Sequence, residues 1–489
     1  MKPSIPQGTR DFSADVVRKR NFIFETIRSV FELYGFQPLE TPAMENIETL
    51  TGKYGEEGDR LIYRILDSGN PFSEDFLVAL AQWMSLDPGV YPALEEMGKK
   101  TATTGSGDLK NLLESELFRK KLLNKLRQAV SGKALRYDLT IPFARYVAMH
   151  HGQLNFPFKR YQIQPVWRAD RPQRGRYREF YQCDADVVGS NSLLNESELI
   201  QIYQDVFAKL QIGVEIKINN RKILAALAEM TGDTTRLTDI TVAIDKLDKI
   251  GLEKVKEELK LKNLAETSLT LIEKYLNIQG TNQEKIEKAK ELFGKNELAN
   301  NGIGELTVLL EYLPQNLSVQ QPVIDFTLAR GLNYYTGTIF EIKARDVSMG
   351  SIGGGGRYDD LTGLFEVPGI PGVGISFGVD RIFDVMEELK IFPEKLQTGT
   401  RVLFFNLGPG ESRAAYPLMQ SLRRRAISCE LFHETAKFDK QFKYAERKNI
   451  PFAVFIGKNE LTDNTCTIKN LHTGEQQTIP QSSITQFEF

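Results

Sequence analysis

The feature that most constrains the fold is the segment 158–189, which reads as strand, turn, strand. Apolar side chains alternate along its first half, a turn-rich stretch follows at 171–175, and a second alternating run begins after the turn. In a strand, every second side chain points to the same face of the sheet. In the second run, the residues that share one face are Arg178, Phe180, Gln182, Asp184 and Asp186. A fold that contains this hairpin must therefore carry an amide and two carboxylates on one face of a sheet.

The turn of this hairpin is strongly basic. Between residues 168 and 178 the chain has five arginines and one acid, Asp170, so the local charge is +4. A solvated turn is one interpretation, but the use of Arg throughout, without Lys, favours bidentate binding of phosphate. Carboxylates buried without partners would be costly, so we expect a cationic ligand or arginines beside Asp184 and Asp186.

The whole chain is nearly neutral, with 62 Lys and Arg against 64 Asp and Glu among 489 residues. This balance excludes a protein that is basic throughout, but it allows a local basic surface. No apolar run approaches the roughly 18 residues of a membrane span, and the N-terminus lacks the apolar core of a secretory signal. Three scattered cysteines offer neither a disulfide framework nor a metal knuckle, so we expect a cytoplasmic protein without membrane contact.

Strand and helix patterns divide the rest of the chain. An amphipathic helix around 23–34 is stopped by Gly35, and an extended edge element follows it at 36–42. The segment 67–132 is loop-rich and predicts an insertion, whereas 220–312 reads as almost entirely helical. Strand patterns return at 338–343 and 372–377. After a linker at 395–400, strands alternate with helices, which predicts a small α/β domain with a mainly parallel sheet.

Two glycine-rich runs, at 353–356 and 372–378, have neither the spacing of a P-loop nor that of the dinucleotide-binding fold. We expect these glycines to allow close backbone approach between packed strands, which can also admit a flat ligand. The four histidines include one adjacent pair, His150 and His151, and form no ligand or triad pattern. A zinc site or a Ser-His-Asp triad is therefore not expected.

Three further segments carry polar residues that need a partner. Asp138 and Thr140 share a predicted strand face just before a helix start, where capping and ligand binding are both open interpretations. Arg330 follows an apolar run and needs an anion, and the adjacent tyrosines at 334–335 should point to opposite faces, which leaves one free to line a pocket. Arg381 stands in the first turn of a helix, where the helix dipole opposes a cation and a bound anion would relieve it.

Taken in order, these segments resemble the histidyl-tRNA synthetase family, a branch of the class II aminoacyl-tRNA synthetases. The match covers nearly the whole chain apart from the insertion at 68–130. Segments similar to the three class II motifs are residues 36–42 with the preceding helix, residues 167–180, and residues 372–381. Segments similar to motifs of the histidine enzymes alone are residues 330–335 and 354–358.

The resemblance implies an α+β catalytic domain, in which helices pack on an antiparallel sheet of the class II synthetase type. It also implies a helical insertion and a C-terminal α/β anticodon-binding domain. The implied bounds are 1–219 with 321–395 for the catalytic domain, 220–320 for the helical module and 400–489 for the anticodon-binding domain. The first part of the catalytic domain would carry the insertion at about 68–130.

The activity implied by the resemblance is the ATP-dependent activation of L-histidine to histidyl-adenylate. Histidine is then transferred to the 3′ end of tRNA(His), and AMP and diphosphate are released. Mg²⁺ would accompany ATP without assigned protein ligands, and the chain would form a homodimer through motif 1. The implied tRNA contacts in the basic turn are Arg171, Arg174 and Arg176.

The resemblance assigns roles to individual residues. ATP would be bound by Arg168, Asp170 and Arg381, and the catalytic residues would be Arg168 and Arg330, which stabilise charge at the α-phosphate. The α-ammonium group would meet Asp138, Thr140 and Gln182, and the imidazole would meet Asp186 and Tyr335. Arg330, Tyr334 and Tyr358 would complete the histidine site. The family often has Asp in place of Asn333, and Glu in place of Asp138 and Asp186.

Two other functions are open to such a chain. One is a non-catalytic paralogue such as the regulatory subunit of ATP phosphoribosyltransferase, which lacks the anticodon domain and loses the ATP-binding arginines. This chain has that domain and retains Arg168, Arg330 and Arg381, which opposes the first alternative. The other is a class II synthetase for a different amino acid, which the segment 330–335 opposes.

Overall fold

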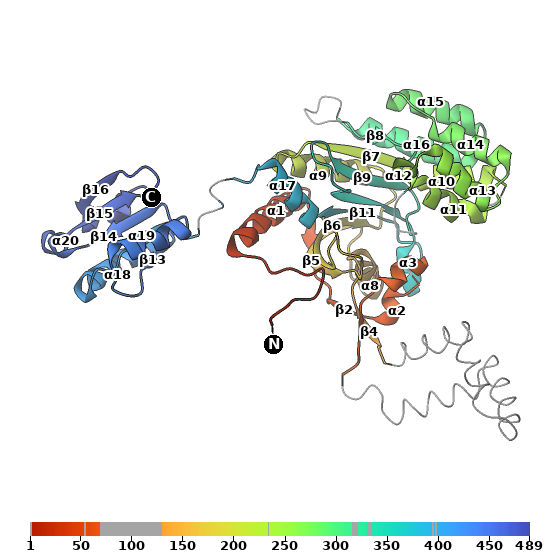
Figure 1. Cartoon of the computed structure of the whole chain (residues 1–489). Helices are drawn as coiled ribbons and strands as arrows, with labels where there is room; N and C mark the ends of the chain where they lie inside the picture. Colours follow the sequence, from red (N-terminus) through yellow and green to blue (C-terminus); the bar gives the residue numbers. More distant parts are fainter. Residues whose placement is uncertain are drawn as a thin grey trace, which may run out of the picture. The chain divides into compact units, whose positions relative to one another are not determined.

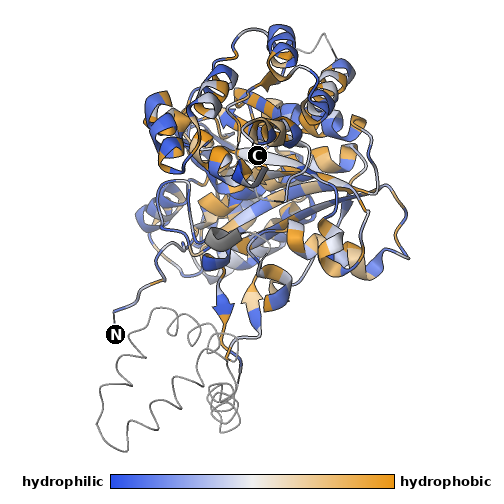
Figure 2. Ribbon diagram, turned by 90° about the vertical axis from the view of Figure 1, so that its right-hand side faces the viewer, coloured by the Kyte–Doolittle hydropathy of each residue, from blue (hydrophilic) through white to orange (hydrophobic). Residues whose placement is uncertain are grey.

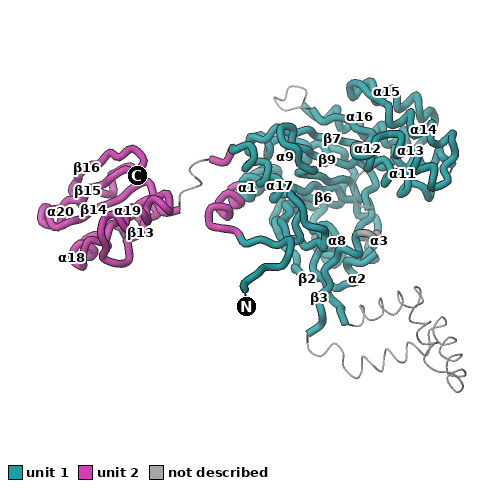
Figure 3. The backbone as a smooth tube through the Cα atoms, in the orientation of Figure 1, with its two compact units in different colours: residues 1–11, 23–390 teal, residues 12–22, 391–489 magenta. Residues whose placement is uncertain are grey.

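The computed structural model describes residues 2–52, 55–68, 130–232, 234–314, 321–329, 334–393, 396 and 399–489. The chain forms two compact units, one made of Met1–Asp11 with Ile23–Lys390 and the other of Phe12–Phe22 with Ile391–Phe489 (Figures 1 and 3). Apart from its ends, the insertion predicted at about 68–130 lies outside the described residues, and so do Arg330 and Asn333. No helix in the described ranges is long and apolar enough to cross a membrane.

The first unit is built on an eight-stranded sheet. In spatial order its strands are β1 (Gln37–Pro38), β5 (Phe158–Trp167), β6 (Glu179–Val188), β11 (Gly372–Gly378), β10 (Gly353–Tyr358), β9 (Thr338–Ala344), β7 (Val214–Asn220) and β8 (Val323–Ile324). All neighbours pair antiparallel except at the two edges, where β1 runs parallel to β5 and β8 parallel to β7. The predicted antiparallel catalytic sheet is confirmed, as is the hairpin at 158–189.

One face of this sheet packs against the helices α1 (Ala14–Leu33) and α9 (Leu194–Lys209). The ring of Phe377 on β11 lies 5.8 Å from that of Phe31 on α1 and 4.7 Å from that of Tyr203 on α9. The Tyr203 hydroxyl reaches the backbone carbonyls of Gly354 at 2.9 Å and Ser376 at 3.0 Å. Helices of the described chain carry both hydrophilic and hydrophobic residues along their ribbons (Figure 2), as expected where one side of a helix packs on a sheet.

The opposite face of the sheet stays polar because side chains alternate along each strand. On β6, Cys183 lies opposite Phe377 and belongs to the apolar face, whereas Asp184 lies opposite Ser376 on the other. Smaller elements stand beside this part of the unit: β2 (Met44–Asn46), β4 (Lys133–Leu135) and β3 (Arg64–Ile65), which form a three-stranded sheet, with α2 (Ile47–Leu50), α3 (Gly55–Arg60), α8 (Thr140–His150), η2 (Leu361–Phe365) and α17 (Val379–Leu389).

Between β7 and β8 the chain forms a run of helices, as predicted for the helical insertion. The elements are α10 (Arg221–Met230), η1 (Thr234–Arg236), α11 (Leu237–Ile244), α12 (Leu247–Ile250), α13 (Leu252–Leu261), α14 (Glu266–Leu276), α15 (Asn282–Phe293) and α16 (Glu297–Tyr312). Local signals start them: Asn220 caps α10, and Thr281 with Glu284 forms a capping box at α15. Gly302 lets α16 approach α10, since a Cβ there would lie 2.9 Å from Ile223 Cγ1.

The second unit contains a five-stranded sheet in the order β13 (Cys429–Leu431), β12 (Val402–Phe404), β14 (Phe452–Phe455), β15 (Thr465–Asn470) and β16 (Gln476–Pro480). Its helices are α18 (Pro409–Arg424), α19 (Phe438–Arg447), α20 (Lys458–Asp463) and η4 (Gln481–Gln486). Phe404 packs in a core with Met419 of α18, and Leu403 packs with Ala445 of α19, so helices cover both faces.

The predicted alternation of strands and helices in this unit is confirmed as far as β14. The expected mainly parallel sheet is only partly right, because β14 pairs antiparallel with β15, and β15 antiparallel with β16. The short helix α20 between β14 and β15 is the reason, since a parallel return needs a longer crossover.

Candidate active site

A pocket opens on the polar face of the eight-stranded sheet. Its walls come from β6, β10 and β11, from the turn before α8 and from the segment before β9. The lining residues are Asp138, Thr140, Arg168, Gln182, Asp184, Asp186, Tyr334, Tyr335, Gly354, Gly355, Tyr358, Gly374, Ile375 and Ser376. Seven of the eight residues predicted to bind histidine therefore surround one cavity.

Asp186 is held from two sides at the base of the pocket. The Tyr358 hydroxyl donates to Oδ1 at 2.5 Å, and Nη2 of Arg160 lies 2.7 Å from Oδ2. Arg160 is fully buried on β5, directly opposite Asp186, and packs on the ring of Phe143. Burial raises the pKa of Asp186, and the Arg160 charge and the Tyr358 hydrogen bond oppose that rise. The cationic partner that we expected for a buried carboxylate is thus supplied by the protein itself.

Asp138 accepts a hydrogen bond at the start of α8 and also lines the pocket. Its Oδ1 accepts a hydrogen bond from the backbone N–H of Ile141 at 3.1 Å, which caps α8, while Oδ2 lies 3.5 Å from the Tyr334 hydroxyl. The residue does not share a strand face with Thr140, because β4 ends at Leu135 and α8 begins at Thr140.

The two tyrosines at 334–335 both line the pocket, so the prediction that they point to opposite faces is wrong. They precede β9, which begins at Thr338, and strand alternation does not apply there. Their rings pack edge to face with centroids 5.0 Å apart. Burial raises the pKa of Tyr335, as do the charges of Asp138 and Asp186, so its hydroxyl stays protonated.

The glycines of β10 and β11 make room for the side chains of the site. A Cβ on Gly374 would overlap the Asp186 carboxylate, and a Cβ on Gly356 would lie 2.9 Å from the ring of Tyr335. A Cβ on Gly355 would overlap the backbone of Gly374 on the neighbouring strand. Close backbone approach is therefore confirmed as the reason for these glycines.

Arg168 is the one arginine of the basic turn region that lines the pocket. Its Nε donates to the Tyr137 carbonyl at 3.0 Å, and its guanidinium carbon lies 4.3 Å from the ring centroid of Tyr137 and 5.2 Å from that of Phe180. In the part of the chain that the structure describes, its terminal nitrogens make no hydrogen bond. The rings on two sides fix the guanidinium at the mouth of the pocket, where it can bind an anion.

The other residues predicted to bind ATP or tRNA lie outside the pocket wall. Asp170 pairs with Arg176 at 2.9 Å, and the exposed Arg174 pairs with Glu388 of α17. Arg171 is exposed. Arg381 binds backbone carbonyls of its own chain, with Nε donating to Gly175 at 2.7 Å and Nη1 to Ser351 at 2.6 Å.

Sequence reasoning did not assign Asp184, Ser376 or Arg160 to the site. The signal for Asp184 was present, because it alternates with Gln182 and Asp186 on β6. Ser376 and Arg160 had no local signal, since each faces its partner only through the pairing of two strands. The described residues contain no group of three or more His, Cys, Asp or Glu side chains that could hold a metal ion.

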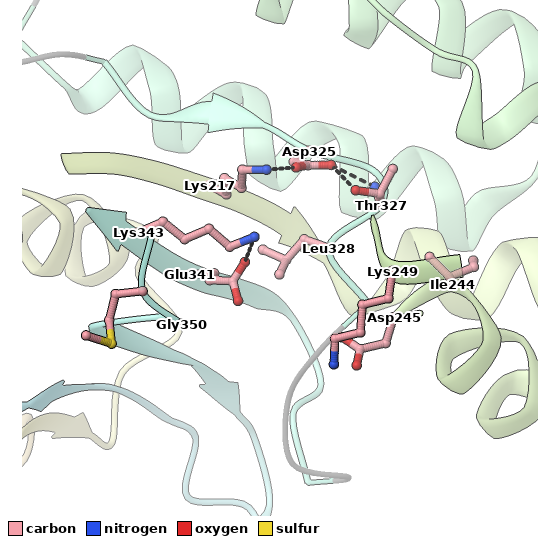
Figure 4. A pocket seen from close by; sticks show the side chains of 11 residues that line it. Lys217, Ile244, Asp245, Lys249, Asp325, Thr327, Leu328, Glu341, Lys343 and Gly350 are labelled. Carbon is pink, nitrogen blue, oxygen red and sulfur yellow. Dashed lines mark hydrogen bonds and ion pairs between the residues drawn. The ribbon is translucent and has the colours of Figure 1, made fainter. Parts of the chain in front are cut away.

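A second cavity is lined by residues of β7 and β9 and of the segments next to them (Figure 4). The two adjoin at the β9–β10 pair, where Glu341 of the second cavity lies opposite Gly354 of the first. Its charges are matched: Lys217 lies 2.7 Å from Asp325, and Lys343 3.4 Å from Glu341 (Figure 4). Because these ions neutralise one another, the cavity does not select a charged ligand in the way that the first pocket does.

Comparison with known proteins gives a consistent result. The family model for histidyl-tRNA synthetase matches residues 118–382, and that for the anticodon binding domain matches residues 402–487. A histidine–tRNA ligase of Porphyromonas gingivalis is 49% identical over 486 residues, covering 99% of this chain and 98% of that protein. One from Flavobacterium johnsoniae is 50% identical over 481 residues, covering 98% and 97%.

Solved structures agree in fold. The crystal structure of histidyl-tRNA synthetase from Nostoc sp. PCC 7120 superposes with a TM-score of 0.75 at 30% identity and covers 99% of both chains. A Bacillus halodurans protein described as an ATP phosphoribosyltransferase regulatory subunit/histidyl-tRNA synthetase has a TM-score of 0.68 at 19% identity, which shows the fold alone. The pocket, the two matching models and the full-length relatives together lead to one conclusion: this chain belongs to the histidyl-tRNA synthetase family.

Proposed function

We propose that this chain is a histidine–tRNA ligase, an enzyme that activates L-histidine with ATP and transfers it to the 3′ end of tRNA(His). The observation that carries the proposal is the charge pattern of one pocket. Three carboxylates, Asp138, Asp184 and Asp186, line its walls, and Arg168 lies at its mouth. Such a pocket suits a ligand with cationic ammonium and imidazole groups at one end and a carboxylate reacting with a phosphate at the other.

Within this pocket, the α-ammonium group binds Asp138, Thr140 and Gln182. The imidazole ring hydrogen-bonds with Asp186 and Tyr335. Tyr334 and Tyr358 close the wall around the ring. A site that hydrogen-bonds a ligand on several sides leaves buried polar groups unpaired when another amino acid enters. Selection for histidine then needs no separate editing site.

The nucleotide lies on the arginine side of the pocket. Arg168 binds the α-phosphate of ATP, and Asp170 also binds the nucleotide. Arg381 exchanges its two backbone carbonyl partners for phosphate oxygens at the far end of the nucleotide. Arg330, outside the described residues, stabilises the charge that develops as the histidine carboxylate attacks the α-phosphate. No general base is required, because the attacking carboxylate is already ionised. Mg²⁺ enters with ATP, bound mainly to its phosphates.

The wider assembly follows the family. The catalytic part consists of residues 1–219 and 321–395, the module 220–320 contacts the acceptor arm, and residues 400–489 bind the anticodon. Arg171, Arg174 and Arg176 of the basic turn meet the acceptor end of tRNA(His). The chain works as a cytoplasmic homodimer, for which light scattering on the purified protein should return twice the mass of one chain.

The deciding experiment is amino-acid-dependent exchange of pyrophosphate into ATP across a panel of amino acids. Exchange with histidine alone is the expected result. Exchange with a different amino acid would make the chain a different synthetase, and no exchange would favour a non-catalytic paralogue. In the same assay, Arg330→Ala should abolish exchange while leaving histidine binding largely intact, and normal exchange by that variant would remove Arg330 from the mechanism.

A further inference from the structure

The three carboxylates of the pocket differ in how many of their oxygen atoms have a partner within the protein. Asp186 accepts a hydrogen bond from Tyr358 on Oδ1, and its Oδ2 forms an ion pair with Arg160 but no hydrogen bond. Asp138 accepts the Ile141 N–H on one oxygen and faces the Tyr334 hydroxyl with the other. Asp184 is only 2% exposed, yet its Oδ1 has no hydrogen-bond partner among the described residues.

A second acceptor without a partner stands next to Asp184. The side-chain oxygen of Gln182 is also buried and unpaired in the described chain. Its amide nitrogen donates to the Ser376 hydroxyl at 2.9 Å, and that hydroxyl hydrogen-bonds the Asp184 side chain. Gln182, Ser376 and Asp184 thus form one connected group that leaves two acceptors, Gln182 Oε1 and Asp184 Oδ1, for a ligand.

Two unpaired acceptors on one wall are costly unless a ligand supplies donors. Each buried polar atom without a hydrogen bond loses its bonds to water without replacement, and the loss is greater when the atom is charged. An imidazole presents one N–H in any one direction, because its two nitrogens lie on different sides of the ring. A primary ammonium group carries three N–H donors on one atom, so it can meet both acceptors at once.

We propose that Asp184, together with Gln182, binds the α-ammonium group of the amino-acid substrate, as a binding residue beyond those assigned above. The inference rests on the proposed function and refines its site: Asp184 supplies the negative charge nearest the ammonium group, and Asp138 helps to shape the start of α8. The position on β6 supports this assignment, since Asp184 follows Gln182 by two residues on the same face and lies opposite Ser376.

The electrostatic surroundings of Asp184 add a measurable consequence. The pKa of Asp184 is raised to about 7, mainly by burial; the Arg160 charge and the Ser376 hydrogen bond oppose this rise, and the charges of Asp186 and Asp138 add to it. Near neutral pH the empty pocket therefore holds a partly protonated Asp184, and a bound ammonium group should expel that proton. The charged and titratable groups whose fields reach Asp184 are Asp138, Asp186, Arg160, Arg136, Tyr203 and Tyr335.

The test compares two ligands that differ only in the amine. Histamine carries an imidazole and an ammonium group, and 4-ethylimidazole carries the imidazole alone. Calorimetry on the full chain should show that Asp184→Asn weakens histamine binding by at least about tenfold, the value of a charge-assisted hydrogen bond, and leaves 4-ethylimidazole binding unchanged. The control Asp239→Asn, which alters a half-buried carboxylate of the helical module that pairs with Lys262, should change neither.

Each other outcome contradicts the proposal. Equal weakening of both ligands would place Asp184 against the imidazole, and unchanged binding of both would remove it from the site. Proton release on binding provides a second test. Titrations with histamine at pH 7 in two buffers of different protonation enthalpy should show more proton release from the wild-type chain than from Asp184→Asn, and equal release would overturn the inference. Pyrophosphate exchange is measured separately, so a failure of the proposed function is distinguishable from a failure at Asp184.

Discussion

At the residue scale, the pocket concentrates charge where a folded chain least tolerates it. Three carboxylates and one arginine, Arg160, have side chains that are nearly or fully buried on or beside the central strands. Arg160 and Asp186 compensate each other, but a buried pair of this kind contributes little net stability because both ions lose their hydration. Burial of these charges is explained by a role in ligand binding. What it costs in the free energy of unfolding can be measured.

Asp184 should make the stability of the ligand-free chain depend on pH. Its pKa is raised to about 7, whereas an unfolded aspartate titrates near pH 3.9. A raised pKa means that the folded chain holds the proton more tightly, so this contribution is present below about pH 4 and is lost as the pH rises to about 7. Asp184→Asn removes the titration and should gain stability relative to wild type by up to about 1.4 kcal/mol per pH unit across that interval.

Urea unfolding of the two ligand-free proteins at pH 5 and pH 8 measures this effect. The free energy of unfolding of the variant minus that of wild type should be larger at pH 8. A difference that is the same at both pH values would mean that the carboxylate does not titrate in this range.

Removal of Arg160 tests the buried ion pair directly. Arg160→Ala leaves Asp186 as a buried carboxylate without its cation, which should lower the free energy of unfolding by about 3–5 kcal/mol. The matched control is Arg174→Ala, which breaks the exposed pair with Glu388 and should change stability little. Similar losses in both variants, measured by chemical denaturation at pH 7, would argue that burial is not the cause.

At the scale of secondary-structure elements, patterns within one element were predictable from the sequence and contacts between elements were not. Alternation along β6 correctly placed Gln182, Asp184 and Asp186 on one face. The partner of Asp186 was not predictable, because Arg160 reaches it through the register of β5 against β6. The adjacent tyrosines at 334–335 were misread because alternation was applied outside a strand.

The same limit explains the errors in the second unit. The sequence pattern identified β12, β13 and β14 with the helices between them. The antiparallel pair β15 and β16 was missed, since its pairing depends on where a short connection turns the chain. Arg330 and the insertion at 68–130 stay predictions, because both lie outside the described residues except for the ends of the insertion.

Helix α16 offers a paired test of how helices pack in the module between β7 and β8. Gly302 faces α10, and a Cβ there would lie 2.9 Å from Ile223 Cγ1 and 3.1 Å from Lys222 Cβ. Gly302→Ala should therefore destabilise the chain by about 1–3 kcal/mol. Gly304 on the same helix has nothing within 4 Å of its Cβ position, so Gly304→Ala should stabilise by about 0.5–1 kcal/mol. Thermal unfolding of both variants checks the two signs, and equal shifts would contradict the packing.

At the scale of the whole molecule, the net charge of −2 says little about function because the charge is unevenly distributed. Arginines gather in the turn at 168–178, while the pocket beside it is acidic. Binding of a polyanion such as tRNA should consequently depend on a few local contacts, each of which weakens as salt rises. All residues that line the pocket belong to the first of the two units.

That division predicts a separation of the two reaction steps. A chain cut after residue 398 loses the five-stranded sheet but keeps every residue that lines the pocket. It should retain histidine-dependent pyrophosphate exchange and lose about 100-fold in tRNA charging, because one of two binding regions for the same tRNA is gone. Parallel loss of exchange and charging in a truncated protein that is still folded would show that the first unit does not suffice for activation.

The hydroxyl of Tyr203 has a consequence for the shape of the pocket. It reaches through from the apolar face to carbonyls of β10 and β11, the strands that form the floor of the pocket. Replacement of this tyrosine by phenylalanine would keep the apolar packing of the ring. It would remove the two hydrogen bonds that hold the backbone of β10 and β11 at the pocket. The shape of the pocket therefore depends on a side chain on the opposite face of the sheet, which does not line the pocket itself.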